Sequence, residues 1–208
     1  MLIATVATFI LPGLDNHVLI FLAVVLGTTV AWVSANRVAI TDMPQMVALY
    51  NGMGGGSAAA IGAVELLRFS AAGGAPSRTI LVLAMVGSLI GAVSLSGSII
   101  AWAKLDGRMD KRYTFPGMQI FNACVAVLTV VLGIMAITTL GVPWIIAFFV
   151  SALALGVLMT LPIGGADMPV VISLYNALTG LAVAFEGYVL GIEMMIIAGM
   201  MVGAAGIL

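Results

Sequence analysis

Charged side chains are too few in this sequence to cover the surface of a water-soluble protein. Lysine, arginine, aspartate and glutamate make up 7% of the 208 residues, whereas 63% are hydrophobic. Soluble domains carry roughly a quarter charged residues, so a chain of this kind must place most of its surface in lipid. The composition predicts an integral, multi-pass membrane protein, and without a basic patch no nucleic-acid partner is expected.

The apolar runs predict an all-α membrane protein of about eight transmembrane helices, because one span takes about 20 apolar residues. The expected helices cover residues 1–11, 16–35, 43–67, 77–105, 118–139, 143–161, 168–185 and 190–208. Asp15 or Asn16 is placed to cap the second helix. Arg37 and the loop after Lys104 carry more basic residues than the opposite side, which puts them in the cytoplasm.

One polar motif occurs twice. The D-M-P of Asp42 returns at Asp167, and each copy continues to an L-Y-N that ends in Asn51 or Asn176. This pattern predicts two parallel three-helix repeats, at about residues 16–105 and 143–208, joined by the helix at 118–139. Residues 1–208 then form a single transmembrane domain.

Both asparagines are expected near the middle of the bilayer. At about 1.5 Å per residue, each lies roughly 13–14 Å from its aspartate, in a hydrocarbon core about 30 Å thick. A buried amide needs partners. Asn51 and Asn176 either bond the helices to one another or order a water-bridged path, and conservation of the pattern in both copies favours the path.

Other polar residues allow two interpretations. Asp42 and Asp167 either cap their helices or, in the case of Asp167, accept protons or contact a cytoplasmic partner. The serines at 94, 96 and 98 either bond the backbone or line a water path. Glu65 and Glu186 lie near helix ends and are expected to be solvated.

The remaining chemistry is sparse. Cys124, inside an apolar run, is expected to be a small buried hydrophobe. The sequence contains no nucleotide-binding loop, no His/Cys metal cluster and no nucleophile triad. We therefore expect no hydride-transfer residue, no metal site and no cofactor bound by this chain.

Three segments together are similar to one known family: D-M-P-Q-M-V-A-L-Y-N at 42–51, G-S-L-I-G-A-V-S-L-S-G-S at 87–98, and G-G-A-D-M-P-V-V-I-S-L-Y-N at 164–176. The chain resembles the membrane-spanning part of the beta subunit of proton-translocating NAD(P) transhydrogenase. The resemblance covers essentially the whole chain, and residues 162–176 are its most specific part.

The resemblance implies a proton-conducting domain that is coupled to hydride transfer between NAD(H) and NADP(H) in separate soluble domains. An NADP(H)-binding domain is then expected after residue 208. The implied partners are an alpha subunit, with its membrane helices and NAD(H)-binding domain, and a second copy of the complete enzyme in a homodimer. The implied location is the bacterial cytoplasmic (inner) membrane.

The resemblance also implies site residues. The proton path would use Asn51, Asn176, Ser98 and Asp167, and a cytoplasmic gate or domain coupling would use Asp42 and Asp167. The family often has histidine where this chain has Asn51, and an amide does not titrate near neutral pH, whereas imidazole does.

Two other functions compete with this interpretation: a secondary transporter with a solute site at the midplane, and a structural membrane anchor for soluble subunits. The gene's continuation past Leu208 separates them, because a glycine-rich βαβ nucleotide-binding pattern there favours the transhydrogenase.

The missing histidine generates a prediction. Amides, hydroxyls and glycines leave a central gap of roughly 10 Å without a titrating side chain, so we expect the alpha subunit to contribute a membrane histidine near Asn51 and Asn176. Replacing each membrane histidine of that subunit by alanine should abolish proton pumping in at least one variant, which Asn51→His should partly rescue. Normal pumping by every variant contradicts the prediction.

Overall fold

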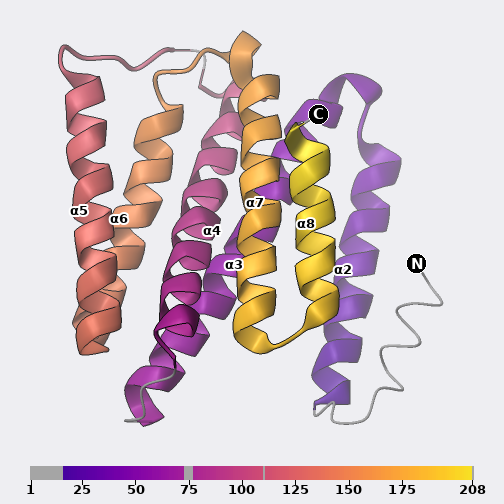
Figure 1. Ribbon diagram of the computed structural model, residues 1–208. Coiled ribbons are helices and arrows are strands. Elements are labelled where there is room, and N and C mark those ends of the chain that lie inside the picture. Colours follow the sequence, from indigo (N-terminus) through magenta and orange to yellow (C-terminus); the bar gives the residue numbers. More distant parts are fainter. Residues whose placement is uncertain (1–15, 73–76, 110, 208) are drawn as a thin grey trace. The chain divides into compact units, whose positions relative to one another are not determined.

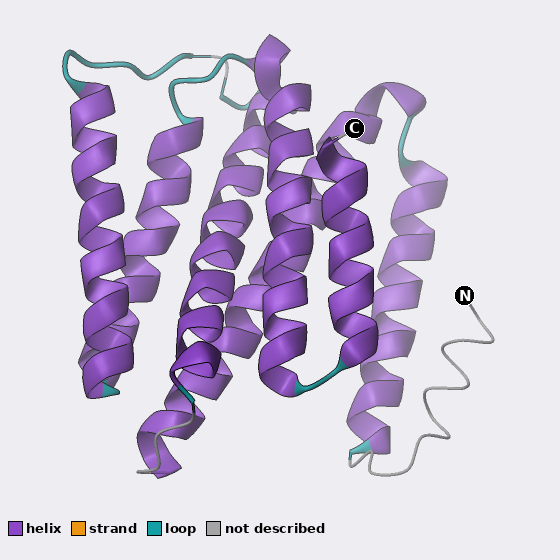
Figure 2. Cartoon of the chain, viewed as in Figure 1, coloured by secondary structure: helices purple, strands orange, loops and turns teal. Residues whose placement is uncertain are grey.

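The computed structural model of the chain describes residues 16–72, 77–109 and 111–207. These residues form seven α-helices and two short 3-10 helices, joined by short connections (Figure 1, Figure 2). Five segments, the helices α2, α4, α5 and α6 and the segment that contains α7, are long and apolar enough to cross a membrane. The expected all-helical membrane class is therefore confirmed, while the helix expected at 1–11 lies outside the described residues.

The chain divides between Met43 and Pro44 into two compact units. In the first unit, α2 covers His17–Arg37 and the 3-10 helix η1 covers Ile40–Asp42. Asn16 precedes α2 in a left-handed conformation, with φ 67°, and its side chain does not cap the helix. The expected cap by Asn16 is therefore wrong. A capping residue typically has an extended backbone, whereas Asn16 is left-handed and its side chain does not bond the first turn. Asp15 lies outside the described residues.

The second unit holds the other helices. They are α3 (Met43–Ala72, from Pro44 on), α4 (Arg78–Leu105), α5 (Met118–Thr139), α6 (Val142–Thr160), the 3-10 helix η2 (Gly165–Asp167), α7 (Met168–Leu190) and α8 (Glu193–Ile207). Helix α4 packs against both α6 and α7, α5 packs against α6, and α8 packs against α7. The α4 helix thus occupies the interior of this unit.

The two copies of the D-M-P motif fold in the same way locally. In each, a 3-10 helix ends at the aspartate and an α-helix begins at the methionine. The proline then stands in the first turn, where its missing N–H would have no intrahelical partner. The motif is thus a helix-start signal in both halves of the sequence.

Helix α7 ends at Leu190 and not near Phe185 as the sequence suggested. The difference lies in the role of two glycines. Gly187 stays helical because it lets α8 approach: a Cβ there would lie 2.8 Å from the backbone nitrogen of Ile196. Gly191 ends the helix in the left-handed conformation, with φ 69°, as a C-terminal glycine commonly does. Helix α3 likewise runs beyond Leu67, to Ala72.

Glycines also bring α3 against α4. A Cβ on Gly91 would lie 2.6 Å from the carbonyl oxygen of Gly55, and a Cβ on Gly55 would lie 2.9 Å from that of Gly91. Real Cβ atoms do not make such contacts, so the two backbones touch directly. In lipid, where helices gain little from burying apolar surface against one another, such close packing drives association.

The outer side of α5 is apolar, and none of the described residues covers it. Val127, Leu128 and Val131 are exposed and line a groove together with Cys124. The expected burial of Cys124 is wrong because its apolar run forms a face turned away from the α5–α6 contact. The surface chemistry suits lipid or another membrane helix.

The glycine contact between α3 and α4 generates a prediction. Gly91→Ala should destabilise the protein by about 1–3 kcal/mol, because the added methyl group has no room against the α3 backbone. Gly27→Ala is the matched control, since a Cβ on Gly27 meets no atom within 4 Å. Thermal unfolding in detergent should give a lower Tm for Gly91→Ala only; equal Tm values would contradict the contact.

Candidate functional site

Three helix ends meet at one end of the second unit. The Nε2 atom of Gln45, at the start of α3, donates to the carbonyl oxygen of Leu105, at the end of α4, over 3.3 Å. Near them, Ala48 of α3 and Ala101 of α4 pack with Met168 of α7. The starts of α3 and α7 therefore lie beside the end of α4, and both helices run from there along the same direction.

Asn51 is buried between α3 and α4. Its side chain belongs to a residue that is 8% exposed, and its Nδ2 atom donates to Ser98 Oγ over 3.0 Å and to Ser94 Oγ over 3.3 Å. Its Oδ1 atom is also buried and has no hydrogen-bond partner. An amide without partners is costly in an apolar interior. The two serine hydroxyls provide partners for the Nδ2 atom of Asn51, whereas Oδ1 remains an acceptor without a partner.

The network continues into α7. Ser94 Oγ lies 2.5 Å from Thr179 Oγ1, and it is placed to donate to the carbonyl oxygen of Tyr175 over 3.4 Å. Both serines are fully buried, and Thr179 is 6% exposed. Asn51, Ser94, Ser98 and Thr179 thus join α3, α4 and α7 through amide and hydroxyl groups; we call these four residues the central network.

Tyr175 extends the polar contacts to α6. Its hydroxyl lies 2.6 Å from Thr160 Oγ1, and Thr160 in turn donates to the carbonyl oxygen of Gly156 over 2.8 Å. Since Thr160 has only one hydroxyl proton, the Tyr175 hydroxyl is the donor of the pair. The phenol fits because Gly97 of α4 has no side chain; a Cβ there would overlap the ring.

Asn176 lies outside this network. It is half-buried, and its side chain forms no hydrogen bond with the described residues. The two motif asparagines therefore do not bond one another, contrary to the interpretation in which they link the helices. The partners of Asn51 are instead hydroxyl groups of α4. Ser96, also considered in the sequence, bonds the carbonyl oxygen of Ala92 in its own helix.

Asp167 is exposed at the start of α7 and does not cap the helix with its side chain. Instead its Oδ2 atom lies 3.2 Å from Nη2 of Arg112, which comes from the connection between α4 and α5. The guanidinium also lies against Gly164, where a Cβ would collide with it. Sequence reasoning missed this arginine, because it approaches Asp167 in space and not along the chain.

Lys104 is a second unforeseen contact at this end. It is 5% exposed, and its Nζ atom donates to the carbonyl oxygens of Leu161 and Ile163, each over 2.6 Å. These carbonyls follow the last turn of α6, where the helix leaves acceptors unpaired. Lys104 therefore ties α4 to the connection that leads to Asp167.

Asp42 belongs to the first unit. Its side chain is exposed at the end of η1, and Oδ1 accepts a hydrogen bond of 3.3 Å from the neighbouring Thr41 hydroxyl. Its carboxylate is therefore available to other groups.

The expectation that Glu186 is solvated is wrong. Glu186 is 0% exposed, and neither of its carboxyl oxygens has a hydrogen-bond partner. The sequence placed it by its distance from the end of α7, but α3 and α4 pack directly against its side chain, at Gly62 and Gly87. Glu65 is buried as well, at 9% exposed, so the expectation is also wrong for it; it pairs with the exposed Arg68 over 3.0 Å.

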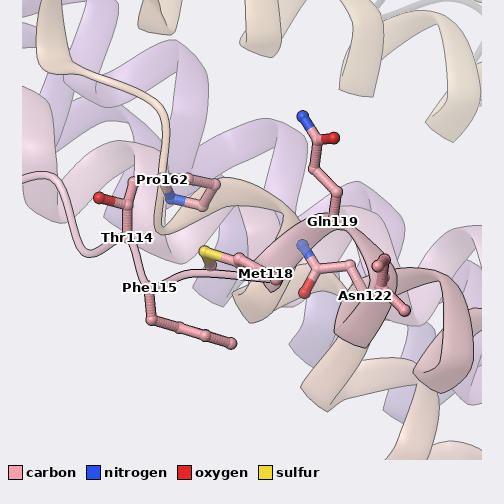
Figure 3. Close-up of a pocket in the computed structure, with 8 residues that line it drawn as sticks. Thr114, Phe115, Met118, Gln119, Asn122 and Pro162 are labelled. Carbon is pink, nitrogen blue, oxygen red and sulfur yellow. The ribbon is translucent and has the colours of Figure 1, made fainter.

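A pocket of about 430 Å³ opens beside the start of α5, with Pro162 at its edge (Figure 3). Asn122 lines it and donates from Nδ2 to the carbonyl oxygen of Leu158 over 3.2 Å. Its lining residues, Thr114, Phe115, Gly117, Met118, Gln119, Ile120, Asn122 and Pro162, include no titratable side chain. The pocket can therefore hold water or a partner side chain but offers no acid or base.

Apolar membrane-length helices that enclose a buried hydrogen-bonded network, with charged residues at one end, define an integral membrane protein with an internal polar site. The NAD(P) transhydrogenase beta subunit family matches residues 1–208, and the chain belongs to that family. It is 38% identical over 211 residues to the NAD(P) transhydrogenase subunit beta of Rhodospirillum rubrum, across 99% of this chain and 46% of the relative. The same subunit from a named strain of that species gives the same figures. The chain thus spans less than half the length of these relatives.

Proposed function

We propose that this chain is the proton-conducting membrane domain of a proton-translocating NAD(P) transhydrogenase. The central network carries the proposal: a buried amide and three buried hydroxyls connect three helices inside an apolar unit. Membership in the beta-subunit family supports it. Hydride transfer between NAD(H) and NADP(H) belongs in this proposal to soluble domains outside this chain.

In this proposal Asn51 and Ser98 are part of the proton path. Asn51 has a free acceptor, Oδ1, and Ser98 accepts from its amide, so a water molecule beside them would find both a donor and an acceptor. Hydroxyl and amide groups order such waters because they exchange roles as partners move. Asn176 contributes to the same path from its half-buried position one residue after Tyr175.

Asp167 and Asp42 serve in the proposal as the cytoplasmic gate and the coupling to a soluble domain. Both carboxylates are exposed, and each ends a 3-10 helix immediately before a membrane helix. The Arg112 guanidinium gives Asp167 a partner that a docking domain could displace. Exposed ion pairs contribute little stability, about 0–1 kcal/mol, so exchanging this one costs little.

The wider arrangement belongs to the proposal as well. The two motif copies and their shared local fold support parallel repeats at residues 16–105 and 143–208. The exposed apolar face of α5 is suited to contact with lipid or with a neighbouring membrane helix. We assign the partners as an alpha subunit and an NADP(H)-binding domain, within a homodimeric enzyme of the bacterial inner membrane.

Ser98→Ala tests the path. The change leaves the Asn51 amide without its nearer acceptor, and we expect proton pumping by the complete enzyme in liposomes to fall by about tenfold, the equivalent of one lost hydrogen bond. Ser57→Ala is the control, because Ser57 is exposed on α3 and bonds only the carbonyl oxygen of Met53. Equal pumping by both variants would remove Ser98 from the path.

Asp167→Asn tests the gate. The neutral amide keeps the shape but loses the charge that faces Arg112, so we expect impaired proton-coupled transhydrogenation with normal membrane insertion. Asp106→Asn is the control, since Asp106 forms a comparable exposed pair with Arg108 over 2.5 Å. Proton uptake during transhydrogenation is the measurement, and full coupling in Asp167→Asn would refute a gating role.

A further inference from the structure

A second polar site lies away from the central network, around Glu186. A Cβ on Gly87 of α4 would lie 2.5 Å from Glu186 Oε1, and one on Gly62 of α3 would lie 2.6 Å from it. The carboxyl group of α7 therefore occupies the space that two glycines leave open on the facing helices. Larger residues at either position would exclude it.

Ser88 shares this space. Its hydroxyl is 0% exposed, has no hydrogen-bond partner, and lies close enough to Gly62 that a Cβ there would collide with it. The site thus gathers three buried oxygen atoms, two from Glu186 and one from Ser88, all without partners. Buried polar groups are normally paired, so an unpaired cluster of this kind marks a site that takes up something.

Among the residues that the structure describes, no cation pairs with Glu186. From α3, the negative charge of Glu65 acts on Glu186, while Arg68 is 72% exposed in its side chain and paired with Glu65. Helix α4 contributes Ser88 and no charged side chain at this level. Helix α8 meets α7 here through Met195 and Ile196, and its own acid, Glu193, is exposed.

A carboxylate without a counter-ion in such a place costs several kcal/mol. One proton removes that charge: it binds a carboxylate oxygen and yields a neutral carboxyl group, whose O–H can donate to Ser88. Glu65, Arg68 and Leu190 line an open groove of about 320 Å³ at the same end of α7.

We propose that Glu186 is a buried proton-binding site of this domain, loaded from the groove at Glu65 and Arg68 and with Ser88 as the acceptor of its O–H. This rests on the proposed proton-conducting function and names the titrating group that this chain supplies to it. The site is separate from the central network. Ser88 and Ser94 are about 9 Å apart along α4, and the Gly55–Gly91 backbone contact lies between their levels.

Infrared spectroscopy of the complete purified enzyme tests the site directly. We expect a carbonyl band of a protonated carboxyl group at neutral pH, which is lost in Glu186→Gln and retained in Glu193→Gln, the exposed acid at the start of α8. Ser88→Ala should shift the band, because the O–H loses its acceptor. This variant keeps the test valid if Glu186→Gln fails to fold. A spectrum without a Glu186-dependent band overturns the proposal.

Proton pumping in liposomes separates this proposal from the function it rests on. We expect Glu186→Gln to lower pumping by at least about tenfold, as for loss of a positioned proton-transfer group, and Glu193→Gln to pump normally. A wild-type enzyme that does not pump refutes the proposed function, whatever the infrared result. A wild-type enzyme that pumps, with equal pumping by Glu186→Gln, refutes the role of Glu186 alone.

Discussion

Direct backbone contact between α3 and α4 is the constraint on which the polar interior depends. Gly55 and Gly91 bring the two helices so close that short side chains reach across on either side of the contact. On one side Asn51 meets Ser94 and Ser98, and on the other the space at Gly62 and Gly87 admits Glu186. In lipid this closeness is favourable in itself, so the packing that holds the unit together also builds both of its polar sites.

The sequence predicted the fold where local chemistry decides it. Helix starts at Met43 and Met168 follow from D-M-P, and α5 was placed correctly at 118–139 by its apolar run. The burial of Asn51 also followed from its distance to the helix start. The end of α7 was placed too early, near residue 185, because a helix-ending glycine and a helix-packing glycine such as Gly187 look alike until the neighbouring helix is known.

Other features depend on contacts between distant segments and could not be read from spacing. Arg112 reaches Asp167, and Lys104 reaches Leu161 and Ile163, across long sequence separations. Depth along one helix also misplaced Glu186, which is buried because its carboxyl group fits against Gly62 of α3 and Gly87 of α4. Thr179 was within reach of sequence reasoning, since it stands on the same face of α7 as Tyr175.

The hydroxyl pair of Ser94 and Thr179 allows the hydrogen bonds at the centre of the domain to run in either of two directions. In the Tyr175–Thr160 pair only the tyrosine hydroxyl can donate, because Thr160 donates its own hydroxyl proton to the carbonyl oxygen of Gly156. Between Ser94 and Thr179 either oxygen is able to donate. If Ser94 donates to the carbonyl of Tyr175, Thr179 points toward Ser94; if Ser94 turns to Thr179, that carbonyl is released. Rotation of the two hydroxyl hydrogens, with no helix displaced, thus reverses the direction of the Ser94–Thr179 hydrogen bond at the centre of the domain.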